Sequence, residues 1–236
     1  MRKQLYILAL TGLLSVPAHA DESENLDRIE KNITESLKSY NLDGKLTRIR
    51  NTPFGNLYEV MIGPDVFYMS GDGRFVLKGD LLDLQEQKNI SEEQRALARK
   101  EILESIPPKE YIEFAPEKTE HVLYVFTDVD CVFCRRLHQD VPALNEQGIA
   151  VRYLAWPRNG VNTEAGNIMQ SVWCADDRQK ALTDAKNDKP VDSRECPNPV
   201  EKQYKLGHMI GVRGTPAIYL EGGQDLRGYR SPEEIA

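Results

Sequence analysis

The sequence predicts an α+β protein in which two folded parts are joined by a charged helix. Three observations carry this prediction. An apolar run at 122–126 is typical of a buried strand, and Cys131 and Cys134 follow it where a helical pattern begins. A helical pattern over 26–40 precedes several short segments with strand character. Between the two parts, residues 91–106 are strong helix formers with few apolar side chains.

The N-terminal residues have the character of a cleavable export signal. Arg2 and Lys3 precede a short apolar stretch at 5–16, which is followed by the small-residue sequence Ala18-His-Ala20. The apolar stretch is too short to span a bilayer. We therefore predict that residues 1–20 are a signal peptide cleaved after Ala20, and that the protein is exported without stable membrane insertion.

The first folded part is expected to be a helix packed on a strand meander. Leu26, Ile29, Ile33 and Leu37 recur at helical spacing on one face. The segments with strand character that follow are 46–50, 57–62, 66–69, 75–77 and 81–84. Because so small a part buries little surface, it is expected to need a partner surface.

The charged helix has clear start and stop signals. Ser91 with Gln94 three residues later predicts a capped N-terminus, and Pro107-Pro108 ends the helical pattern. Because apolar residues are few, we interpret this helix as a solvated linker between two domains. A helix packed on the surface of one domain is the alternative.

The Cys-x-x-Cys sequence predicts redox chemistry. Free N–H groups and the helix dipole at a helix start stabilise a thiolate, so Cys131 is assigned as the attacking nucleophile and Cys134 as the resolving thiol. A zinc site would need two further ligands, whereas Cys174 and Cys196 are 22 positions apart with no His nearby. The spacing therefore favours a redox pair over a metal site, and favours Cys174–Cys196 as a structural disulfide among the three possible pairings.

The second folded part continues in a regular alternation. The helix after Cys131 is expected to run to about Gln147 and to end at Gly148, before a strand at 149–156 that lies parallel to the first. Helical pieces at 162–203 form an insertion. A final hairpin is predicted from 217–221 through Gly222-Gly223 to 227–229, and helix-start character at 231–236 predicts a terminal helix shorter than usual, as in a truncated chain.

A proline far downstream completes a recognisable arrangement. Thr215-Pro216 stands directly before a β-rich run. Strand, Cys-x-x-Cys helix and such a proline together are typical of the thioredoxin fold, which predicts a cis bond at Pro216. Backbone groups beside that bond are free to pair with a substrate strand.

Four runs of this sequence resemble the DsbC/DsbG family of periplasmic disulfide isomerases, and DsbC more closely than DsbG. They are 126–138, 151–158, 172–175 and 214–217. The resemblance covers nearly the whole chain after residue 20. It implies a cystatin-like dimerisation domain at 21–88, a linker helix at 89–108 and a thioredoxin-like catalytic domain with a helical insertion at 109–236.

The resemblance also implies site residues and a function. It supports the same cysteine pairing, and it implies substrate contacts from Thr215, Pro216, Val132 and Phe133. The implied protein is a periplasmic, homodimeric thiol:disulfide isomerase with chaperone activity, which reshuffles wrong disulfides in misfolded or misoxidised exported proteins. A DsbD-type inner-membrane reductase is its implied partner, and no cofactor is implied.

Other functions remain open on the residues themselves. The alternatives are a DsbG-like reductase of oxidised cysteines, a dithiol oxidase, and a non-enzymatic chaperone or thiol metal-binding protein. Val132-Phe133 departs from the Gly-Tyr of DsbC and the Pro-Tyr of DsbG, which leaves the balance between these activities open. The net charge of −7 argues against general binding to nucleic acid or anionic membranes.

The residues that tune the thiols are partly readable. Val125 stands where thioredoxins carry a buried acid, so a proton acceptor has to come from elsewhere. Asp128 and Asp130 are expected to oppose a Cys131 thiolate, and Arg135 and Arg136 to favour it. His138 is interpreted as a packing or surface residue.

Overall fold

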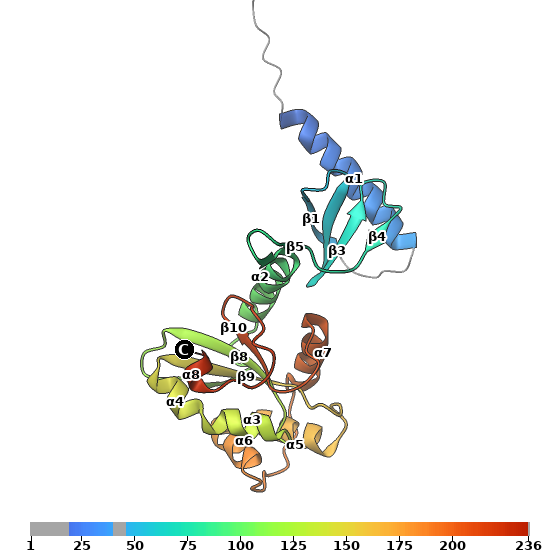
Figure 1. The fold of residues 1–236 in the computed structure, drawn as a ribbon. Helices are drawn as coiled ribbons and strands as arrows, with labels where there is room; N and C mark the ends of the chain where they lie inside the picture. The colour runs from blue at the N-terminus through green and yellow to red at the C-terminus, as the bar shows by residue number, and fades with distance from the viewer. Residues whose placement is uncertain (1–18, 40–45, 236) are drawn as a thin grey trace, which may run out of the picture.

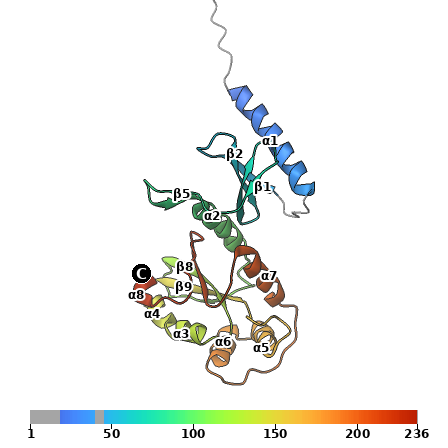
Figure 2. The same ribbon diagram turned by 45° about the vertical axis from the view of Figure 1, so that its right-hand side comes forward.

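The computed structural model describes residues 19–39 and 46–235 (Figure 1). The predicted signal peptide lies outside the described residues except for His19 and Ala20. An N-terminal part and a larger C-terminal part stand apart, and helix α2 (Ile90–Glu104) lies between them in both ribbon views (Figures 1 and 2). No helix among the described residues is long and apolar enough to cross a membrane.

The N-terminal part is a helix on an antiparallel sheet, as the sequence predicted. Helix α1 (His19–Ser39) covers strands β1 (Leu46–Asn51), β2 (Leu57–Ile62), β3 (Asp65–Ser70) and β4 (Val76–Leu77), which are hydrogen-bonded in that order. Ile29, Ile33 and Leu37 are buried in one cluster with Val60 and Met69. The helical spacing thus placed the buried face correctly except at Leu26, which is exposed. β4 lies at the edge of the sheet and is exposed.

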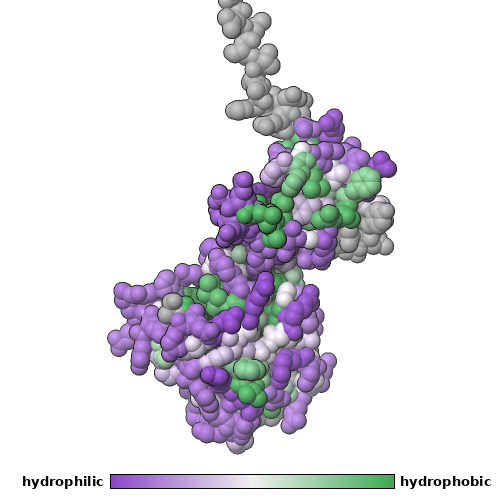
Figure 3. Space-filling view, in the orientation of Figure 1, coloured by the Kyte–Doolittle hydropathy of each residue, from purple (hydrophilic) through white to green (hydrophobic). Residues whose placement is uncertain are grey.

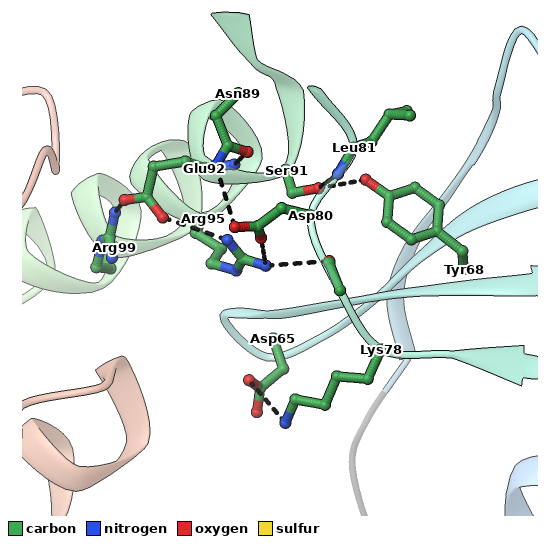
Figure 4. A network of polar contacts seen from close by, with 11 residues as sticks. Asp65, Tyr68, Lys78, Asp80, Leu81, Asn89, Ser91, Glu92, Arg95 and Arg99 are labelled. Atoms are coloured by element: carbon green, nitrogen blue, oxygen red, sulfur yellow. Dashed lines mark hydrogen bonds and ion pairs between the residues drawn. The ribbon is translucent and has the colours of Figure 1, made fainter. Parts of the chain in front are cut away.

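The start of α2 differs from the prediction. Asn89 is the N-cap, and its side chain accepts a hydrogen bond from the Glu92 N–H (2.9 Å) (Figure 4). Ser91 is instead buried in the first turn, where its hydroxyl accepts from the Leu81 N–H (2.8 Å) and hydrogen-bonds the Tyr68 hydroxyl. The serine therefore ties the helix to the N-terminal sheet. A short hairpin of β5 (Leu82–Asp83) and β6 (Lys88–Asn89) precedes helix α2, and β6 was not predicted.

The interpretation of α2 as a solvated helix is wrong, because the helix packs on both parts and not, as in the alternative, on one domain alone. Ala96, Arg99 and Leu103 are buried. The Arg99 guanidinium donates to the Gly223 carbonyl (2.8 Å), lies 5.5 Å from the Tyr219 ring centre and pairs with Glu92. A long charged side chain can bury its stem while its head group is paired, so a polar composition did not reveal this contact.

Gly223 is expected to be required for this packing. It has φ +81°, and an added Cβ would overlap the Ala96 carbonyl of α2. Gly228 has φ +92° with open space around it. In urea unfolding, Gly228→Ala should therefore cost only the backbone strain, about 1–2 kcal/mol, whereas Gly223→Ala should cost about 1–3 kcal/mol more. Equal losses in the two variants would contradict the packing of α2 on this turn.

The C-terminal part is built on a mixed sheet. Strands β7 (Ile112–Phe114), β8 (His121–Thr127), β9 (Ile149–Ala155) and β10 (Ala217–Leu220) are arranged in the order β10-β8-β9-β7. β8 and β9 are parallel as predicted, the outer pairs are antiparallel, and β7 was not predicted. Both central strands are buried on both faces, which explains their continuous apolar runs.

The two faces of the sheet belong to different cores. Leu123 and Val125 join one core, and Tyr124 and Phe126 join the other, as the two-residue repeat of a strand requires. The first core includes residues of α3 (Val132–Gln139), α4 (Val141–Glu146), α5 (Glu164–Trp173) and α6 (Arg178–Lys186). The second includes residues of α2 and of α7 (Val200–Ile210). Helices therefore lie on both faces.

Two local predictions in this part are wrong. The helix after Cys131 is two helices that meet at Asp140, because Pro142 has no N–H with which to continue the first. The predicted strand at 227–229 is absent, since Arg227 (φ +53°) and Gly228 turn the chain; only Asp225 bridges back to Tyr219. Gly148 ends α4 in the left-handed region (φ +77°), and α8 (Pro232–Ile235) begins where the helix start was predicted.

Candidate active site

The carboxyl end of β8 places the two cysteines. The strand ends at Thr127, a short loop follows, and Cys131 is the N-cap of α3 with Cys134 in its first turn. The Cys134 N–H donates to Cys131 Sγ (3.3 Å), and both residues are free thiols. A sulfur at an N-cap receives the N–H groups that a helix start leaves unpaired, which favours its anionic form.

The proline loop meets this helix start. The Thr215-Pro216 bond is cis, and Cys131 Sγ lies 3.1 Å from the Thr215 carbonyl oxygen across 84 positions of sequence. The Thr215 hydroxyl is buried without a hydrogen-bond partner. Next to this loop lies a groove of about 390 Å³, lined by 211–217 and four residues near the turn: Tyr219, Asp225, Arg227 and Gly228.

Exposure differs sharply within the Cys-x-x-Cys turn. Cys131 is 2% exposed and Cys134 is fully buried, so the predicted nucleophile lies in a recess. The two residues between them stand out instead, with Val132 73% and Phe133 56% exposed. The rim of the recess on this side is therefore apolar.

The environment holds the two thiols in different protonation states. The pKa of Cys131 is lowered to about 5, first by its hydrogen bond with the Cys134 thiol, then by the adjacent Thr215 side chain, the Cys134 N–H and the Arg158 charge; burial opposes these effects. Burial raises the pKa of Cys134 far above its ordinary value, and its hydrogen bond to Cys131 adds to this. Cys131 is therefore an anion at neutral pH, and Cys134 is a neutral thiol that supports it.

The charges around the loop differ from the expected set. Asp128 is buried, and Arg158 binds its Oδ2 through Nε (2.9 Å) and the backbone N–H (3.0 Å). The negative charge of Asp128 is thus paired with Arg158, and the positive charge of Arg158 favours the Cys131 thiolate. Arg135 binds Asp188 (2.7 Å), and Arg136 lies over the Tyr229 ring, so neither arginine is directed at the sulfur as the sequence suggested.

Two further titratable groups lie behind the redox pair. His138 is buried between the Tyr153 hydroxyl (3.2 Å) and the Thr183 hydroxyl (3.0 Å), which confirms it as a packing residue. Lys186 is buried and donates to Thr127 (2.7 Å). Sequence reasoning missed Arg158 and Lys186. The signal for Lys186 was its position four after Leu182 on one helix face, readable only once the helix was known.

The other cysteines are joined. A disulfide links Cys174, the C-cap of α5, to Cys196 in the loop before α7, with an S–S distance of 2.02 Å. The bond closes the part of the insertion between α5 and α7 into a loop of 22 positions. Within the residues that the structure describes, no group of three or more Cys, His, Asp or Glu side chains is arranged to hold a metal ion.

Alkylation of Cys131 is expected to show its low pKa. An ordinary thiol loses reactivity as the pH falls through about 9 to 8. Because the Cys131 pKa is about 5, its thiolate fraction should stay near its maximum down to pH 6 and halve only near pH 5. The measurement is the rate of iodoacetamide modification of reduced protein against pH, with Cys131→Ser as the control for Cys134. A rate that already falls between pH 9 and 8 would contradict the proposed thiolate.

Comparisons with known proteins agree with this geometry. Residues 16–92 match the family model described as disulfide bond isomerase protein N-terminal domain, and 108–236 match that of a thioredoxin-like domain. The chain is similar to the thiol:disulfide interchange proteins DsbC of Dickeya dadantii (34% identity) and Salmonella typhimurium (33%), over all of this chain and 94% of each relative. A crystal structure of a Neisseria gonorrhoeae disulfide interchange protein is similar over 55% of this chain and 94% of that one, with 30% identity and a TM-score of 0.50.

Proposed function

Because the chain belongs to the DsbC family of thiol:disulfide interchange proteins, we propose that it reshuffles wrong disulfides in exported proteins through Cys131 and Cys134. One observation supports this most directly. Cys131 Sγ lies at the N-cap of α3, opposite the cis Pro216 loop, with its pKa lowered beside a neutral Cys134 thiol. Such a sulfur is both a good nucleophile and a good leaving group.

The reaction is a sequence of thiolate exchanges. The Cys131 thiolate attacks one sulfur of a substrate disulfide, forms a mixed disulfide and releases the other substrate sulfur as a thiolate. A different substrate thiolate then attacks the mixed disulfide and displaces Cys131. The substrate has changed its pairing, no electrons have been gained or lost overall, and the enzyme is reduced as before. Cys134 provides an exit when no substrate thiol attacks.

The surroundings of Cys131 fit an extended, partly unfolded substrate. We assign Thr215 and Pro216 to pairing with a substrate strand, because this loop meets the sulfur and adjoins the groove. The exposed Val132 and Phe133 are assigned to apolar contacts with the same segment. Apolar contacts without sequence readout suit a catalyst that must accept many substrates.

We propose that the protein is an exported homodimer. Its parts are a signal peptide (1–20, cleaved after Ala20), a dimerisation domain (21–88), a linker helix (89–108) and a catalytic domain (109–236). Hydrophobic side chains form patches on the N-terminal part (Figure 3), and its exposed large ones include Phe54, Phe75, Val76, Leu77, Leu82 and Leu84. Two such parts facing each other would cover these residues. The compartment is the periplasm, where a DsbD-type reductase returns oxidised enzyme to the dithiol.

The dipeptide between the cysteines supports a second candidate within the same chemistry. Val132 offers no hydrogen-bond donor and Phe133 no hydroxyl, and both are exposed at the edge of the site. A change here alters the relative stability of dithiol and disulfide. Should the disulfide be the resting form, the same residues would oxidise substrates.

Recovery of a scrambled protein separates these activities. The mature protein is added to a scrambled substrate with several disulfides in a glutathione buffer, and the recovery of substrate activity is compared with that in buffer alone. Rapid recovery supports isomerase function. No recovery, together with efficient oxidation of a reduced substrate, would replace it with oxidase function. Zinc or copper retained by protein purified under reducing conditions would favour a metal-binding protein instead.

A further inference from the structure

A buried lysine lies behind the redox pair with few partners. Lys186, the last residue of α6, is 3% exposed, and its ammonium group donates to the Thr127 hydroxyl (2.7 Å). The ammonium also lies 5.3 Å from the centre of the Tyr153 ring. No carboxylate forms an ion pair with it within the ranges 19–39 and 46–235 that the structure describes. A buried cation with so little compensation is costly, which calls for a reason.

The groups that face Lys186 come from three elements. They are Cys131, Cys134, Arg135 and His138 at α3, Asp128 in the loop after β8, and Tyr153 on β9. Thr127, which binds the ammonium, is the last residue of β8 before the cysteine turn, and Tyr153 beneath the ammonium hydrogen-bonds His138, one turn beyond Cys134 on α3. Among the groups here that can carry a negative charge, Cys134 has the largest charge interaction with Lys186. Asp128 is already bound by Arg158. The counter-charge best suited to this ammonium is therefore a thiolate on Cys134.

We propose that Lys186 is a positioning residue that stabilises the Cys134 thiolate when Cys134 attacks a mixed disulfide on Cys131. This inference rests on the proposed function and concerns its exit step. Val125 on β8 is apolar and fully buried, so the strand supplies no acid or base at that position. Lys186 supplies the missing polar group from the helical insertion instead.

The exit step transfers the disulfide bond of Cys131 from the substrate sulfur to Cys134. Cys134 loses its proton, and its thiolate attacks Cys131 Sγ in the mixed disulfide. The bond from Cys131 to the substrate sulfur breaks as the Cys131–Cys134 disulfide forms. The substrate sulfur leaves as a thiolate and takes up a proton in place of the one released by Cys134. The enzyme pair is oxidised by two electrons, the substrate disulfide is reduced by two, and Lys186 stays protonated.

The electrostatics of the two side chains support this role. Burial raises the pKa of Cys134, and the positive charge of Lys186 lowers it in opposition. Burial also lowers the pKa of Lys186 to about 8, so the group is still mostly protonated at neutral pH. An ammonium that is present but weakly compensated gains most from a new negative charge beside it.

A coloured aromatic disulfide, dithiobis(nitrobenzoate), resolves the two steps. Attack by reduced Cys131 releases the first nitrothiobenzoate, and attack by Cys134 on the mixed disulfide releases the second. We expect Lys186→Met to slow the second phase about tenfold, to change the first phase much less, and to move the pH midpoint of the second phase upward by about one unit. Lys186→Gln retains a donor for Thr127 but carries no charge, so it should behave in the same way.

Lys180→Met is the matched control, because Lys180 lies on the same helix with a side chain that is 73% exposed. Both of its phases should equal those of the wild type. A second phase with the wild-type rate and pH midpoint in Lys186→Met and Lys186→Gln would overturn the role of Lys186; should Lys186→Met fail to fold, Lys186→Gln carries the test. A wild-type protein with no rapid first phase would overturn the proposed function itself.

Discussion

Cys131→Ser is expected to reduce the recovery of scrambled substrate to the rate of the glutathione buffer alone. The serine hydroxyl is not ionised at neutral pH and forms no disulfide, so no mixed disulfide can begin the reaction. Serine is a favourable N-cap, and it can accept the Cys134 N–H that Cys131 Sγ accepts. The helix start should therefore persist, and the loss should reflect chemistry alone.

Cys134→Ser is the informative comparison. It leaves the nucleophile in place but removes the exit step, so it should retain measurable isomerisation and accumulate mixed disulfides with substrate. Trapped species are counted on a non-reducing gel, and peptide binding checks that both variants still hold substrate. Isomerase activity that survives in Cys131→Ser would show that Cys131 is not the nucleophile.

Leu77→Asp is expected to convert a dimer into monomers and to abolish isomerase activity. Leu77 lies on the edge strand β4 and is 56% exposed, close to the exposed Phe75 and Val76. Covering such a side chain is worth about 1.5–3 kcal/mol. A two-fold dimer loses it twice, so the dissociation constant should rise by at least about a hundredfold.

Sedimentation equilibrium measures the outcome directly. Leu97→Asp is the matched control, because Leu97 is also exposed (44%) but lies on α2. It should leave the dimer intact. The Leu77→Asp monomer should still release nitrothiobenzoate in both phases of the reaction with dithiobis(nitrobenzoate), since Cys131 and Cys134 lie in the C-terminal part. A wild-type monomer, or a Leu77→Asp dimer with full activity, would contradict the proposed assembly.

The sequence predicted what short windows contain. The α1 face of Ile29, Ile33 and Leu37 was predicted from helical spacing, and the parallel pair β8–β9 from strand–helix–strand order. The redox pair and the cis bond at Pro216 were predicted from motifs that are local in sequence. Each element was recognised from a signal that spans a few residues, as backbone periodicity does, and the parallel pairing and the cis bond were predicted from the order of these elements along the chain.

Local signals failed where side chains had more than one use. Ser91 is a residue type that often caps helices, but its hydroxyl hydrogen-bonds Tyr68 and Leu81, and Asn89 caps the helix. The charged composition of α2 suggested solvent, whereas Arg99 reaches the Gly223 carbonyl across 124 positions. Composition reports which groups a residue can pair with and leaves the partner open.

The sequence by itself predicted the cysteine turn and the proline loop that meets it, because each is marked by a motif a few residues long. Only the tertiary structure decided which charges act on the sulfurs. Arg158 pairs with Asp128 across 30 positions, and Lys186 meets Thr127 across 59. Electrostatic interactions depend on distance and burial in space, and neither quantity can be read from residue order until the chain has folded.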